Sequence, residues 1–487
     1  VQTLLTDELP GAAVLATLQQ LRAKSLVLAG DDDFALLAPV RDYALGELSR
    51  RGLEESLTAR HRDYQATRVR ELLRLRETEG ARRTLVRLER EADDVLAAVE
   101  HALGAPNPQI GFVLGALVAL EPLISARGPL PAFTEILSRA ISAADAESVR
   151  GFVELLSRVL LLRGRLLTTS GRFQQGREDL LRARSLGEQV ESDELLGAIL
   201  LEIGVNHHFQ RELAAARACY ERALELCRGA RQGAVRGRCY GNLGAVLHDE
   251  GRLTEAAAHY WKAIRALEEG GEARELGNFL SNLAVLEQEL GARADARRHY
   301  QQALAYLGEL AETRLHAIAL GNLGVLEAED GAWEAALKCH EQALSLLQTQ
   351  NDAFSEALCR ARLGAALAVL RREDEANEQL SHARRMIVEA DAPRIAAVRL
   401  QRAFLDFARA RRALEGGERS EARERLRLAE DVSAEIASEL HEGVKLTTLS
   451  DDVRAALRLL APLVRGVRHR LERDAEPPSS PTLVAER

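Results

Sequence analysis

The sequence is poor in aromatic residues and in proline. Phe, Trp and Tyr together make up 4% of its 487 residues, and only 12 prolines are present. Ala, Leu, Glu and Arg dominate instead, and these residues favour helix. The composition therefore predicts helix nearly everywhere and little β structure. Because 487 residues exceed what one hydrophobic core usually supports, we expect several modules or an open-ended repeat array.

Cysteine pairs and long apolar runs are also lacking. The five cysteines have no C-x-x-C spacing, which excludes a disulfide framework and a zinc site, and we expect buried small side chains there. No apolar run approaches the roughly 20 residues of a membrane span, and no charged-then-apolar signal segment opens the chain. We therefore expect a cytoplasmic protein without a membrane partner.

Cationic charge is not in excess. The formal net charge is −9, and the Arg-rich stretch 68–90 alternates with Glu as a solvated helix face does. This balance argues against a nucleic-acid partner, because such proteins usually carry a basic patch.

Motifs of catalysis are missing as well. The sequence contains no G-x-x-x-x-G-K-[ST] loop to hold phosphates, and no nucleophile-elbow or zinc-protease motif. His207 and His208 are adjacent, so on a helix they point about 100° apart and cannot chelate one metal. We predict neither an enzyme nor a cofactor or metal site.

What the sequence does contain is a repeat of 40 residues. The segment YGNLGAVLHDEGRLTEAAAHYWKA, from Tyr240, recurs in altered form from Leu280 and from Leu320. Three series of small residues keep the same step across six units. They are Gly164, Gly204, Gly244, Ala284, Gly324 and Gly364; Gly176, Ala216, Ala256, Ala296, Ala336 and Ala376; and Ala183, Ala223, Ala263, Ala303, Ala343 and Ala383.

The residue types in each unit indicate two packed amphipathic helices, called the A helix and the B helix here. Small residues at Gly244, Ala256 and Ala263 allow the two helices to approach closely, while large ones such as Tyr260 fill the space between pairs. A glycine recurs where the A helix must end, which predicts a left-handed C-cap. These glycines are Gly171, Gly251, Gly291 and Gly331.

The pattern resembles the tetratricopeptide repeat, with small residues at its eighth, twentieth and twenty-seventh positions and a large one at its twenty-fourth. The longer unit is similar to the Leu-Gly-Asn subfamily. The resemblance implies a right-handed tetratricopeptide-repeat superhelix, an α-solenoid, with regular units over about 152–390. Gly128, Phe133 and Ala140 indicate a degenerate leading unit, and Gly417, Ala422, Leu426 and Ala429 a degenerate seventh.

The front of the chain does not share the period. LQQLRAKSLVL, a DDD turn and FALLAPVRDYALGEL follow the order of a winged helix. With RHRDYQA from Arg60 and LVRLEREADDVLAAVEHAL from Leu85, this resembles the winged helix and connector of STAND-class signal-transduction NTPases. The resemblance implies a piece of a longer protein, with an NTPase core before Val1 or in another polypeptide. Arg22 and Lys24 are candidates for DNA contact, but two basic residues are too few for useful affinity.

We accordingly expect five segments: a winged-helix-like module at 1–55, a helical connector at 56–104, the solenoid at 105–440, a C-terminal capping helix at 441–472 and a disordered tail at 473–487. The helix from about Asp451 to Glu472 would complete the cap of the array.

The resemblance also implies a binding groove, because A helices line the concave surface of such solenoids. In the repeat family an Asn at position six holds peptide backbone, which implies this role for Asn242, Asn282 and Asn322; bracing of the neighbouring repeat is the alternative. Small residues nearby, such as Gly241 and Gly321, would leave room for an extended chain. Further groove candidates are Arg238, Asn278, His248, Gln288, Arg362, His208, Arg165 and Arg158.

Three functions remain open from the sequence. In the first, the chain is the sensor arm of a STAND-like protein that binds a protein or peptide, including an acidic one, or that contacts its own NTPase domain. Alternatively it is a stand-alone scaffold for protein–protein interaction, or a transcription regulator that uses the winged helix.

Overall fold

A computed structural model of the chain describes residues 11–29, 34–78, 81–105, 108–127, 131–146, 151–229, 233–270, 272–309, 313–348, 352–387, 392–441 and 450–473. The chain divides into two compact units. The first unit comprises residues 1–210 and 222–227, and the second comprises 211–221 and 228–487. Within the described residues, no helix is both long and apolar enough to cross a membrane.

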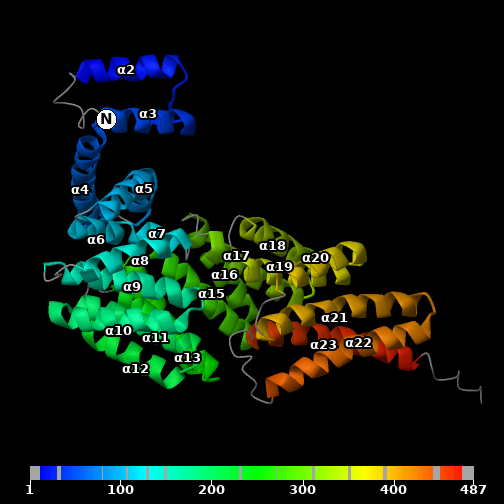
Figure 1. Ribbon diagram of the computed structural model, residues 1–487. Helices are drawn as coiled ribbons and strands as arrows, with labels where there is room; N and C mark the ends of the chain where they lie inside the picture. The colour runs from blue at the N-terminus through cyan, green and yellow to red at the C-terminus, as the bar shows by residue number, and fades with distance from the viewer. Residues whose placement is uncertain are drawn as a thin grey trace, which may run out of the picture. The chain divides into compact units, whose positions relative to one another are not determined.

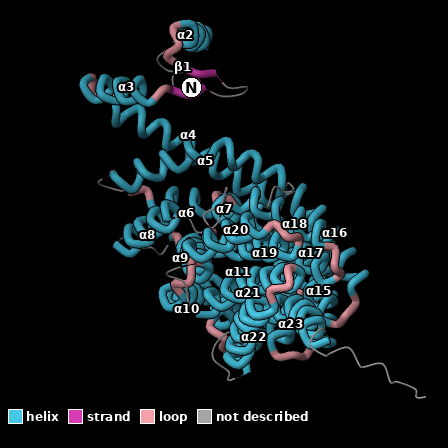
Figure 2. The backbone as a smooth tube through the Cα atoms, turned by 90° about the vertical axis from the view of Figure 1, so that its right-hand side faces the viewer, coloured by secondary structure: helices cyan, strands magenta, loops and turns pink. Residues whose placement is uncertain are grey.

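The described part of the first unit begins with a helix, a hairpin and a second helix (helices in Figure 1, strands in magenta in Figure 2). These are α2 (Gly11–Ala23), β1 (Val27–Ala29), β2 (Phe34–Leu36) and α3 (Ala38–Arg50). The strands are antiparallel, with Val27 opposite Leu36. The predicted order of elements is confirmed, while the DDD turn at Asp31, Asp32 and Asp33 lies outside the described residues.

Five helices then lead to the regular repeats. They are α4 (Glu54–Thr78), α5 (Ala81–Gly104), α6 (Ile110–Ala119), α7 (Glu121–Arg127) and α8 (Pro131–Ala146). Phe133 and Ala140 of the predicted leading unit are buried in α8, whereas Gly128 lies outside the described residues.

Six regular helix pairs follow in the described residues, and the 40-residue period is confirmed. The A helices are α9 (Val153–Thr169), α11 (Asp193–Phe209), α13 (Gly233–Asp249), α15 (Ala273–Glu289), α17 (Thr313–Glu329) and α19 (Ala353–Val369). Each has 17 residues and begins 40 residues after the one before. The B helices are α10 (Phe173–Val190), α12 (Leu213–Leu226), α14 (Leu253–Gly270), α16 (Arg293–Glu309), α18 (Trp333–Leu347) and α20 (Glu373–Met386).

The four predicted turn glycines adopt the left-handed conformation at the ends of their A helices. Gly251 has φ +75°, its N–H donates to His248, and the next N–H, of Arg252, donates to Leu247. This pair of bonds is the Schellman motif, which satisfies carbonyls that the helix end leaves free. Arg211 and Arg371 occupy the same place in their units with φ +63° and +69°, although neither is a glycine.

Small and large residues meet between the A and B helices as predicted. A Cβ on Gly244 would lie 2.9 Å from the Tyr260 ring, and Tyr260 is 2% exposed. Gly324 meets His340 in the same way, and Gly364 meets Leu380. The repeat register read from the sequence is therefore correct, because these glycines leave no space for any side chain.

The second unit ends in three longer helices: α21 (Ala392–Glu415), α22 (Arg419–His441) and α23 (Ser450–Arg473) (Figure 1). Ala422, Leu426 and Ala429 are buried, and Gly417 ends α21 with φ +81°, so the displaced seventh pair is confirmed. The helix α23 packs against α21 and α22 (Figure 2). The tail predicted at 473–487 lies, after Arg473, outside the described residues.

Candidate ligand-binding face

Four of the predicted groove residues occupy one register position in successive A helices of the second unit. Asn242 lies in α13, Asn282 in α15, Asn322 in α17 and Arg362 in α19, each 40 residues after the last. All four are half-buried. We call these four residues the ladder, and the side of the A helices that carries them the A-helix face.

The three asparagines of the ladder differ from an asparagine that braces the neighbouring repeat. Asn206, in the first unit, is buried, and its Nδ2 donates to Thr168 Oγ1 at 2.9 Å and to the Phe173 carbonyl at 3.0 Å. In the described part of the chain, the side chains of Asn242, Asn282 and Asn322 form no such hydrogen bond. Their amide groups are therefore available for a ligand, and the bracing alternative lacks the bonds it requires.

The room expected beside the small residues of position five is already filled, which corrects the sequence-based interpretation. A Cβ on Gly241 would lie 2.2 Å from the Phe279 ring of the next A helix. A Cβ on Gly321 would lie 3.2 Å from Arg362 Nη1. These glycines admit side chains of the following repeat, so they leave no room for a ligand backbone beside the ladder.

Two other predicted contact residues have partners inside the fold. His248 Nε2 lies 2.9 Å from Glu289 Oε2, and both side chains are nearly buried. The Tyr300 hydroxyl donates to Gln288 Oε1 at 3.2 Å. His248 therefore stabilises the packing of successive repeats and Gln288 the packing within one repeat, and their removal would disturb the A-helix face indirectly. Arg238 and Asn278 are half-buried on α13 and α15.

The carboxyl of Glu289, next to His248, has a lowered pKa. Burial by itself would raise its pKa, but the hydrogen bond from His248 and the charges of His248, Arg458 and Arg454 lower the pKa below its ordinary value. Its Oε1 atom is buried and has no hydrogen-bond partner among the described residues. The carboxylate is therefore held charged by cations that include two residues of α23.

The remaining candidates lie in the first unit and do not belong to this ladder. Arg165 contacts Glu121 at 3.3 Å, and the buried Glu202 lies 4.0 Å from it. Arg158 pairs with Glu154 at 3.0 Å along the same helix. His208 is half-buried near the end of α11. The pairing of both arginines inside the fold weakens the expectation that they attract an acidic ligand.

Sequence reasoning missed a small cavity at the Arg362 end of the ladder. Its volume is about 20 Å³, and His340, Arg362, Phe404 and Ala455 are among its lining residues. That is room for about one water molecule. Burial, together with the charge of Arg362, lowers the pKa of His340 to about 3. Sequence could have flagged His340 only as the histidine in the series Tyr220, Tyr260 and Tyr300.

The helix α23 was also missed as part of this face, because sequence indicated only an end cap. Ala455, Ala456 and Leu459 of α23 line the same cavity as Val325 and Ala328 of α17. In the described part of the chain, no group of three His, Cys, Asp or Glu side chains is placed to hold a metal.

Comparisons with known proteins agree on the repeat. A family model described as tetratricopeptide repeat matches residues 236–269 and 278–310. No curated protein sequence matches the chain. A Rap protein complexed with Competence and Sporulation Factor has a similar structure, with a TM-score of 0.51 and 14% identity, covering 77% of this chain and 99% of that one.

Two further solved structures are similar at lower scores. The STAND protein with a tetratricopeptide repeat sensor from Pyrococcus horikoshii has a TM-score of 0.45 and 13% identity, covering 97% of this chain and 62% of that one. The apo quorum sensor NprR from B. thuringiensis has a TM-score of 0.44 and 16% identity, covering 76% and 99%. The repeat model and the Rap structure establish the fold as a helical-repeat solenoid of tetratricopeptide type.

Proposed function

We propose that this chain is a non-catalytic binding solenoid whose A-helix face takes a peptide or a segment of another protein. The observation that carries the proposal is the row of asparagine amides at Asn242, Asn282 and Asn322, which have no hydrogen bonds within the described protein. Amides at a regular spacing suit a ligand with repeating backbone N–H and C=O groups, because each side-chain amide can donate and accept at once. The Rap protein of similar fold was solved with Competence and Sporulation Factor bound, which is consistent with this reading.

The test uses the intact chain and peptides selected on it from a displayed library of random sequences. Replacing Asn242, Asn282 and Asn322 together with Ala should weaken binding of a selected peptide between about ten-fold and a thousand-fold, at roughly 0.5–1.5 kcal/mol for each lost hydrogen bond. Helicity and the unfolding midpoint should stay unchanged, because the three amides make no hydrogen bonds with the described residues.

The matched control removes three exposed amides from B helices, Gln301, Gln302 and Gln342, in one variant. This control should bind the peptide as the native chain does. Undiminished affinity in the asparagine variant would overturn the assignment of the ladder as the binding site.

We further propose that the solenoid is the effector-recognition arm of a STAND-like signalling or defence NTPase in the cytoplasm. The helix, hairpin and helix from α2 to α3, followed by the connector helices α4 and α5, support this context. Ligand binding would then shift an attached NTPase between two states by its different affinity for each. The proposal predicts a G-x-x-x-x-G-K-[ST] loop either ahead of Val1 in the gene that encodes this chain or in a polypeptide that binds this chain, and the absence of both would contradict it.

A further inference from the structure

The helix α23 extends further into the second unit than an end cap needs to. A cap must cover only the last pair, α21 and α22, but α23 also contacts α17, which lies two pairs earlier. Arg458 Nε donates to Glu329 Oε1 of α17 at 3.1 Å, between residues 129 positions apart in the sequence. The helix therefore lies along the A-helix face.

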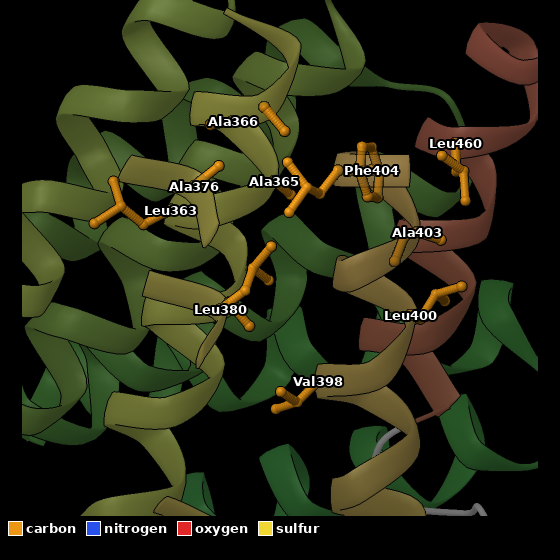
Figure 3. Packing of buried hydrophobic residues seen from close by; sticks show 14 of the residues in the cluster. Leu363, Ala365, Ala366, Ala376, Leu380, Val398, Leu400, Ala403, Phe404 and Leu460 are labelled. Carbon is orange, nitrogen blue, oxygen red and sulfur yellow. The ribbon is translucent and has the colours of Figure 1, made fainter. Parts of the chain in front are cut away.

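One side of α23 is apolar and buried. Its buried residues follow a three- and four-residue spacing, as an amphipathic helix in a groove requires. They are Val453, Ala456, Leu460, Val464, Val467 and Leu471, and Ala455 is buried beside Ala456. Leu460 of α23 belongs to one hydrophobic cluster with Ala403 and Phe404 of α21 (Figure 3).

The charges on α23 match the carboxylates beside the ladder. Glu329 is only 7% exposed and pairs with Arg458, which is itself exposed at 43%. Glu289, one repeat earlier at the same position, is held charged by Arg458 and Arg454 as well as by His248. Arg454 and Arg458 are one helical turn apart, so they project along the same edge of α23.

The helix α23 also covers one end of the ladder. Arg362, the fourth ladder residue, lines one cavity with Ala455, Ala456 and Leu459 of α23. A ligand that runs from Asn242 to Arg362 would meet α23 at the end of its path.

We infer that α23 is a built-in competitor that covers the Arg362 end of the ladder, and that a ligand spanning the ladder must displace it. The inference rests on the proposed function. Because eight residues, 442–449, join α23 to α22, α23 is always present at a high local concentration. The observed affinity for a ligand therefore equals the affinity of the undocked chain multiplied by the fraction of molecules in which α23 is undocked.

Displacement would also unfold α23. Pro462 lies inside the helix and cannot donate a backbone hydrogen bond, so α23 depends on its packing for helical structure. Hydrogen exchange of the amides in 450–473 therefore reports whether α23 is docked.

The experiment compares full-length Leu460→Asp with full-length Ala461→Asp. Leu460 is 1% exposed and Ala461, its neighbour, is exposed, so the two variants add the same charge at adjacent positions of one helix. The probe is a fluorescent synthetic peptide with the native sequence of residues 450–473. We expect the Leu460→Asp chain to bind the probe at least about ten-fold more tightly than the native chain, with fast exchange in 450–473. The Ala461→Asp chain should match the native chain in both measurements.

A charge exchange tests the contact itself. Arg458→Glu places two carboxylates together and should raise probe binding, whereas Arg458→Glu with Glu329→Arg restores an internal pair and should exclude the probe again. Equal probe binding by the native, Leu460→Asp and Arg458→Glu chains would overturn the inference. So would slow exchange of 450–473 in Leu460→Asp. The asparagine variant leaves the α23 contacts intact, so failure of the inference is distinguishable from failure of the ladder assignment.

Discussion

At the residue scale, one large side chain in each repeat packs against one small one. Tyr220, Tyr260 and Tyr300 are fully or almost fully buried at this position, as their recurrence every 40 residues predicted. What surrounds a ladder residue was less predictable, because it depends on the following repeat. Phe279 fills the space beside Gly241, and a pattern that marks only small residues does not reveal that.

Removal of the Tyr260 ring should be costly. Tyr260→Ala is expected to lower the free energy of unfolding by roughly 3–5 kcal/mol, because the ring is 2% exposed and fills the space between helices. Trp261→Ala, at the neighbouring position, is the control. The Trp261 side chain is 39% exposed, so its removal should cost much less. Urea denaturation of both variants would measure the difference. A loss below about 1 kcal/mol for Tyr260→Ala would contradict the packing described.

His340 stands where three other repeats have tyrosine, and it gives stability a pH dependence. Its pKa is about 3 in the fold against 6.5 for an ordinary histidine, because burial and then Arg362 disfavour the charged ring. Between these values the unfolded chain binds the additional proton, so stability is complete above pH 6.5 and falls as the pH drops towards 3.

His340→Tyr should remove this part of the acid sensitivity while keeping a large side chain in the site. Urea midpoints of the native chain should fall more than those of the variant between about pH 7.5 and about pH 4.5. His469→Tyr, at an exposed position of α23, should behave as the native chain. Parallel curves for His340→Tyr and the native chain would refute a neutral, buried His340.

At the element scale, the 17-residue A helices and their ends were predictable because each end carries its own local signal. Gly251, Gly291 and Gly331 mark a left-handed turn, and the structure has positive φ at all three. Arg211 and Arg371 take the same conformation without that signal, so the sequence did not mark these two turns. The path of α23 lay beyond the sequence for a related reason: its apolar stripe shows one buried side but not which helices bury it.

The turns allow a reciprocal substitution. Gly331→Arg should lower the free energy of unfolding by about 1–2 kcal/mol, because no atom lies within 4 Å of a Cβ there and the left-handed backbone is the only cost. Arg371→Gly should change stability little or raise it by up to about 1 kcal/mol, since relief of the same strain is offset by chain entropy and by its exposed pair with Glu415. Thermal melts of both chains give the comparison, and a tolerated Gly331→Arg would show that the turn has another conformation.

At the scale of the molecule, the second unit combines two kinds of connection. Along the array, contacts run mainly between neighbours: α13 with α14 and α15, α15 with α16 and α17, α17 with α18 and α19. In such an array, a substitution destabilises its own pair most and the adjacent pair next, because each pair is stabilised by its neighbours. The helix α23 is the exception, because it connects α17 directly with α21 and α22.

This arrangement predicts a gradient of hydrogen exchange in the Tyr260→Ala chain. Protection should fall most in α13 to α16, and less in α17 and α18, because each pair shares contacts chiefly with the next. In the Leu460→Asp chain, protection should instead fall in α17, α21 and α22 together, since α23 contacts all three. Exchange read peptide by peptide on both full-length variants would separate the two patterns. A uniform rise across α13 to α22 after Tyr260→Ala would mean that the second unit unfolds as one cooperative core and not as a chain of pairs.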